Sequence, residues 1–71
     1  MHAIRKAEDA VDRAKEYADE YCSGDWEEII GVNESGDNWM VIFETSTGDG
    51  SKGHMVSIES TGKITNYVST Q

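Results

Sequence analysis

The spacing of apolar residues changes at Ser23-Gly24, and this change constrains the fold more than any other feature of the sequence. In residues 3–22, apolar side chains recur every three or four positions, as they do along one face of an α-helix. Alanine, the best helix former, is frequent there, and neither proline nor glycine interrupts the stretch. We therefore expect a helix over residues 3–22 that stops at Gly24, where glycine can take the left-handed conformation.

After Gly24, aromatic and β-branched residues form short runs between turn-forming clusters, which is typical of β-strands. The runs predict four strands, at about residues 26–32, 39–45, 54–59 and 63–68. Parallel neighbours would need crossovers of a dozen or more residues, so the short links here favour antiparallel pairing. The sequence thus predicts an α+β fold in which one N-terminal helix packs on a four-stranded antiparallel β-meander.

A chain of 71 residues and 7.9 kDa is expected to form a single domain over residues 1–71 with a small core. Cys22 is the only cysteine, so an internal disulfide cannot add stability. The longest apolar run, residues 39–43, is far shorter than the ~20 residues that cross a bilayer. The first ten residues lack the apolar stretch of a secretion signal, and we expect a cytoplasmic protein.

Alternation along the strands assigns side chains to the two faces of the sheet. Because aromatic side chains fill the space above small alanines well, Trp39, Val41 and Phe43 should face the helix. The other strands are expected to complete this core with Trp26, Ile30, Val32, Val56, Ile58, Ile64 and Val68, with His54 at its rim.

The opposite face of the sheet is expected to stay apolar although no helix covers it. An uncovered face should alternate to polar residues. Here it should instead carry Met40, Ile42, Met55, Tyr67 and, as an open alternative, Ile29, with Glu44 and Lys63 at its rim. Contiguous exposed apolar surface marks interfaces, and methionine suits an adaptable one. We predict a non-enzymatic binding or accessory module that uses this face for a protein partner or for a homodimer, although scattered exposed apolar residues are also ordinary.

The acidity of the chain supports a second hypothesis. Fourteen acidic against six basic residues give a net charge of −8, which opposes direct binding to nucleic acid or to an anionic membrane. Such a chain could instead act as a phage-type inhibitor that occupies the basic groove of a nucleic-acid-binding protein. The contacts would come from Asp25, Glu27, Glu28, Glu34, Asp37 and Asp49. Solubility alone accounts for the same charge without any partner.

No catalytic, cofactor or metal site is predicted. Residues 48–53 match the pattern G-x-G-x-x-G, but a dinucleotide site needs it between a strand and a helix, and here it joins two strands. Cys22 lies near a helix C-terminus, where the helix dipole disfavours a reactive thiolate, so a structural role is favoured. His2 and His54 pair with no recognisable nucleophile, and the carboxylates lack the spacing of a calcium loop.

The second half of the chain resembles two families of small domains. Residues 56–64, with the sequence VSIESTGKI, resemble the closing hairpin of PepSY-type modules, in which Thr-Gly-Lys precedes the last strand. Residues 39–44 and 55–58, together with Asn66-Tyr67, are similar to gas-vesicle protein O sequences. Both families begin with a helix and continue into antiparallel strands. The resemblance, which covers about residues 26–68, implies a non-catalytic accessory or peptidase-modulating domain with no catalytic residues to carry over.

Overall fold

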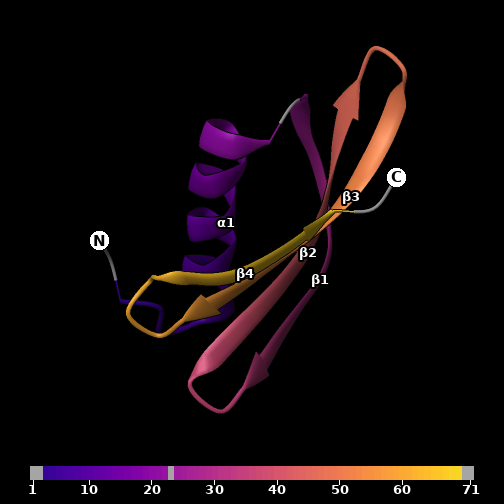
Figure 1. Cartoon of the computed structure of the whole chain (residues 1–71). Coiled ribbons are helices and arrows are strands. Elements are labelled where there is room, and N and C mark those ends of the chain that lie inside the picture. Colours follow the sequence, from indigo (N-terminus) through magenta and orange to yellow (C-terminus); the bar gives the residue numbers. More distant parts are fainter. Residues whose placement is uncertain (1–2, 23, 70–71) are drawn as a thin grey trace.

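The computed structural model describes residues 3–22 and 24–69, and it has the predicted fold. One helix precedes four strands, which are α1 (Ala7–Tyr21), β1 (Asp25–Ser35), β2 (Asn38–Thr47), β3 (Gly50–Glu59) and β4 (Ile64–Ser69). The strands form one antiparallel sheet in the order β1-β2-β3-β4, and α1 lies across one face of it (Figure 1). The sheet therefore has a helix face and an open face.

The helix is shorter than predicted at its N-terminal end. Residues 3–6 are not helical, because Ile4 is buried and its backbone N–H donates to the carbonyl of Ser60 at 2.7 Å. This bond ties the start of the chain to the turn between β3 and β4. At the other end, the Cys22 N–H bonds to the carbonyl of Ala18, and Gly24 takes the predicted left-handed conformation with φ of 86°.

The segment between β2 and β3 is a tight hairpin. The predicted strands at residues 39–45 and 54–59 left a long connection between them, but β2 continues to Thr47 and β3 already begins at Gly50. Thr47 pairs directly with Gly50, so only Gly48 and Asp49 form the turn. The Thr47 hydroxyl donates to the carbonyl of Gly50 at 3.1 Å and accepts from the Asp49 N–H at 3.2 Å. Backbone pairing extends through these polar residues because a two-residue, glycine-containing turn keeps the strands in register.

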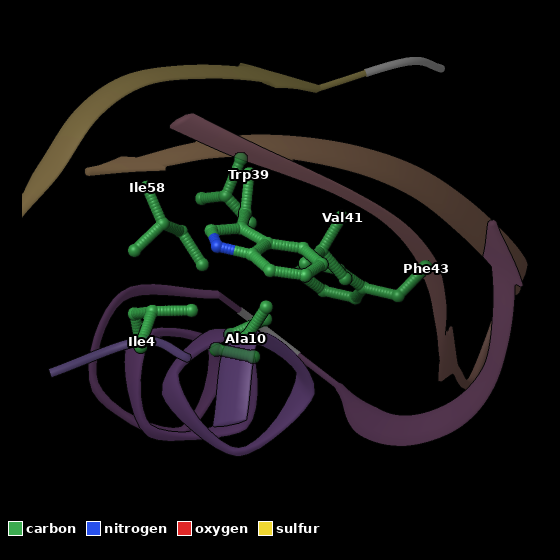
Figure 2. Close-up of a cluster of buried hydrophobic side chains, with 9 residues drawn as sticks. Ile4, Ala10, Trp39, Val41, Phe43 and Ile58 are labelled. Carbon is green, nitrogen blue, oxygen red and sulfur yellow. The ribbon is translucent and has the colours of Figure 1, made fainter. Parts of the chain in front are cut away.

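The core lies between α1 and the middle of the sheet, as predicted. Ala10, Ala14 and Ala18 form the buried stripe of the helix. Figure 2 shows Trp39, Val41 and Ile58 of the sheet reaching toward Ala10 and Ile4. The predicted core residues Phe43 and Val56 are fully buried as well. Small alanines let the backbones approach closely, so the larger side chains of the sheet fill the interior.

Two bulges reverse part of the predicted facing of β1. Register shifts occur between Trp26 and Glu28 and between Ile29 and Gly31. Ile29 consequently lies opposite Phe43 on the helix face, whereas Ile30 is 56% exposed. The prediction that Ile30 belongs to the core and Ile29 to the open face is therefore wrong. Each bulge inserts one extra residue and so breaks the alternation on which the prediction depended.

A third irregularity changes the facing of β4. Ser57 pairs with Asn66 and Ile58 with Ile64, so one extra residue, Thr65, stands between them. Ile64 faces the core as predicted, but Tyr67 now shares its face. Val68 lies on the open face and is 44% exposed. The predictions that Val68 joins the core and that Tyr67 lies on the open face are both wrong.

Candidate functional site

An apolar row crosses all four strands on the open face. The register aligns Gly31 of β1 with Ile42 of β2, Ile42 with Met55 of β3, and Met55 with Val68 of β4. Ile30 precedes Gly31 in the bulge of β1. We define the apolar row as Ile30, Ile42, Met55 and Val68. These four side chains line one shallow depression of about 390 Å³.

The structure brings together some of the predicted binding residues and excludes others. Ile42 and Met55 lie in the middle of the apolar row and are half-buried. Met40 shares their face but has Asn33 and Ser57 as its cross-strand neighbours, so it stands at the polar side of the row. Sequence reasoning missed Ile30 and Val68. Both are apolar strand residues, and simple alternation along β1 and β4 placed them in the core.

Carboxylates border the apolar row at the end of the sheet near the β2–β3 turn. Glu44 lines the depression, as its predicted rim position implies, and Glu28 lies directly opposite it on β1. The Ser51 hydroxyl donates to a carboxylate oxygen of Glu27 at 2.8 Å, which holds Glu27 at the same end. Among the ion pairs of the described residues, none involves these three carboxylates. Lys63, predicted at this rim, lines a groove beside α1 instead.

The six acidic residues of the second hypothesis fall into two groups. Asp25 pairs with Ser46, so it lies with Glu27, Glu28 and the turn residue Asp49 at one end of the sheet. The other two carboxylates lie at the opposite end, at the turn between β1 and β2. They are Glu34 and Asp37, and all six residues are exposed. A basic partner that contacts these carboxylates would therefore lie at one end of the sheet and not along a whole edge of it.

On the helix face, His54 and three residues distant from it in sequence form a polar cluster. The three residues are Cys22, Thr45 and Tyr67. The His54 ring is 4% exposed and lies between the rings of Phe43 and Tyr67, so its predicted place at the rim of the core is wrong. Its Nε2 is 2.9 Å from Oγ1 of Thr45, and its Nδ1 is 2.7 Å from the Tyr67 hydroxyl. The Sγ atom of half-buried Cys22 lies 3.7 Å from that hydroxyl and 3.8 Å from Nδ1.

When the His54 imidazole is neutral, the side chains of the cluster can meet its hydrogen-bonding needs among themselves. Burial, assisted by nearby Lys52, lowers the pKa of His54, and burial together with the Cys22 contact raises the pKa of Tyr67. The thiol then donates to the Tyr67 oxygen, the Tyr67 hydroxyl donates to Nδ1, and the Nε2 hydrogen goes to Thr45. The cluster thus joins the C-terminal end of α1 to β2, β3 and β4.

Comparisons of the chain with protein-family models, with curated proteins and with solved structures found no significant match. The resemblance to PepSY-type modules and to gas-vesicle protein O therefore remains a prediction. Within residues 3–22 and 24–69, no helix is long and apolar enough to cross a membrane. In the same part of the chain, no three His, Cys, Asp or Glu side chains are grouped as ligands for a metal ion.

Proposed function

We propose that this chain is a non-enzymatic protein-binding module whose partner docks on the open face of the sheet. The observation that carries the proposal is the apolar row. Its outer members, Ile30 and Val68, are two of the three large hydrophobic residues exposed among the described residues. When a partner buries apolar surface of this kind, the removal from water contributes about 25 cal/mol of favourable free energy per Å². A row that spans the whole width of the sheet supplies such a surface.

The charges beside the row favour one kind of partner. Glu28, Glu44 and Glu27 gather at one end of the open face and have no cation paired with them among the described residues. A partner with apolar side chains followed by lysine or arginine would complement both features. A second copy of this chain fits less well, because each copy carries a net charge of −8. The partner that we propose is therefore a protein with a basic, amphipathic surface.

Two matched variants test this proposal. Ile30→Lys places a charge in the apolar row, and Ala7→Lys places the same charge at an exposed residue of α1 that lines neither the depression nor the groove beside α1. Both sites are exposed, so both variants should keep the fold, which circular dichroism would verify. In affinity capture from cells that contain the chain, Ile30→Lys should reduce recovery of the partner by about tenfold or more, because burial of one isoleucine is worth ~2 kcal/mol. Equal recovery with all three proteins would contradict the proposal.

The acidic-inhibitor hypothesis is kept as a second candidate because four of its six residues do gather at one end of the sheet. They are Asp25, Glu27, Glu28 and Asp49. Binding through these exposed carboxylates should weaken steeply with added salt, since exposed charges are screened over about 10 Å at ~0.1 M salt. Binding centred on the apolar row should weaken much less, because salt does not screen apolar contacts. Repeating the capture at low and moderate salt, with an Asp25→Asn/Asp49→Asn variant beside Ile30→Lys, therefore separates the two functions, since only the inhibitor hypothesis uses these two aspartates.

A further inference from the structure

A groove on the helix face separates α1 from the edge strand β4. The helix packs against β1 and β2, so it leaves the outer strand partly uncovered. The groove has a volume of about 540 Å³. Among the residues that line it are Arg13, Tyr17, Tyr21, Lys63, Ile64 and Tyr67. It lies on the opposite side of the sheet from the apolar row.

Three tyrosines form a continuous aromatic wall in this groove. The ring centroids of Tyr21 and Tyr17 are 4.9 Å apart, and those of Tyr17 and Tyr67 are 5.4 Å apart. The inner end of the wall is fixed, because the Tyr67 hydroxyl bonds to His54. Tyrosine and arginine are the residue types that are enriched in the energetically important centres of protein interfaces. A fixed wall of tyrosines beside an arginine therefore offers rigid contact area to a ligand.

The groove is also a cationic region in an acidic protein. Arg13 and Lys63 are two of only six basic residues in a chain of net charge −8. The Arg13 Nε donates to the carbonyl of Gly62 at 2.7 Å, which holds the guanidinium beside the β3–β4 turn. Its Nη1 lies 3.6 Å from Glu16, so part of its charge is already paired. Lys63 is exposed and forms no ion pair with any residue in the described part of the chain.

The two edge strands of the sheet differ in how they resist pairing with another strand. β1 carries Asp25, Glu27, Glu28 and Glu34 and has two bulges, which are features that protect an edge from further strands. β4 runs from Ile64 to Ser69 without a charged residue or a proline, and its bulge is confined to its start, at Thr65. The edge beside the tyrosine groove is thus the less protected one.

We propose that this edge and groove bind an extended acidic segment of a partner protein, which pairs with β4 as a fifth strand. Backbone hydrogen bonds along β4 would provide affinity, and alternate side chains of the segment would enter the groove. Its carboxylates would lie beside Lys63 and the unpaired part of Arg13. This site is separate from the open face and goes beyond the proposed function, so either can hold without the other.

Selection from a displayed library of random short peptides tests the site directly. Peptides enriched on the wild-type protein should be rich in Asp and Glu and poor in Lys and Arg. Lys63→Glu should remove or reverse this charge preference. Lys52→Glu, the same change at an exposed position of β3 outside the groove, should keep it. Failure to enrich any peptide, or enrichment without an acidic preference, would overturn the proposal.

The location of an enriched peptide must then be established. Nuclear magnetic resonance titration of the wild type with that peptide should shift the amides of β4 and the rings of Tyr17 and Tyr21, and it should leave Ile42 and Met55 unchanged. Tyr21→Ala should weaken binding by at least about fivefold, whereas Ile30→Lys should have no effect. Shifts on the apolar row, or sensitivity to Ile30→Lys, would assign the peptide to the open face and overturn the proposal. A wild-type dimer that Lys63→Glu dissociates would identify a second copy as the occupant and would also overturn it.

Discussion

The hydroxyl of Tyr67 lies 2.7 Å from Nδ1 of His54, and this contact fastens the edge strand β4 to the buried part of β3. It exists because the extra residue Thr65 turns Tyr67 toward the helix. The same ring packs on Tyr17, so α1 is tied to β4 through aromatic contact as well. The stability of the sheet edge and the shape of the tyrosine groove thus depend on one side chain.

Removal of this hydroxyl should destabilise the domain. Tyr67→Phe keeps the ring but leaves Nδ1 of buried His54 with only the weak contact of the Cys22 thiol 3.8 Å away, which should cost about 1–3 kcal/mol in the free energy of unfolding. Tyr21→Phe is the matched control because Tyr21 is 68% exposed, and it should change stability by less than ~0.5 kcal/mol. Urea denaturation followed by circular dichroism measures both values. Equal stability of the two variants would show that the buried hydroxyl adds nothing.

The stability of the domain should fall as the pH is lowered through the range in which histidine titrates. Burial lowers the pKa of His54 below 6.5, so the unfolded chain binds a proton more readily than the folded one. The contribution of neutral, buried His54 to the stability is then fully present above about pH 6.5, and it is lost progressively as the pH falls below that value. Urea midpoints between pH ~7.5 and ~5.5 measure the effect. His54→Gln should remove the decline, and a wild type with the same flat profile would contradict this account.

Two glycines should respond differently to the same substitution. Gly24 has φ of 86°, and a Cβ at that position would collide with the backbone oxygen of Ser46. Gly24→Ala should therefore cost more than the ~1 kcal/mol that a left-handed residue alone requires. Gly31 has no heavy atom within 4 Å of the place where a Cβ would stand, so Gly31→Ala should stay within ~0.5 kcal/mol of the wild type. Thermal unfolding of the two variants makes the comparison.

Truncation of the central core residue should largely unfold the protein. Phe43 is fully buried and stacks between Trp26 and His54, with ring centroids 4.6 and 5.1 Å away. Phe43→Ala should cost about 3–5 kcal/mol, which is comparable to the few kcal/mol that a domain of this size has in total. Loss of dispersed amide resonances would reveal the unfolded state. Ile30→Ala, at a 56% exposed residue, should keep the native spectrum.

The sequence alone determined the elements and their order. The three-to-four spacing before Gly24 and the glycine turns after it are local signals, and the structure confirms the helix, the four antiparallel strands and the central core of Trp39, Val41 and Phe43. These predictions hold because the period of apolar residues and the conformational freedom of glycine act over only a few residues.

Only the tertiary structure decided which side chains form the apolar row and which enclose the groove. Ile30, Tyr67 and Val68 all changed faces from their predicted positions because bulges in β1 and β4 each insert one residue. A shift of a single residue moves every later side chain of a strand to the opposite face, and the site of such a shift depends on pairing between strands. The contact of Cys22 with His54 and Tyr67 likewise joins segments that approach one another only after the sheet has formed.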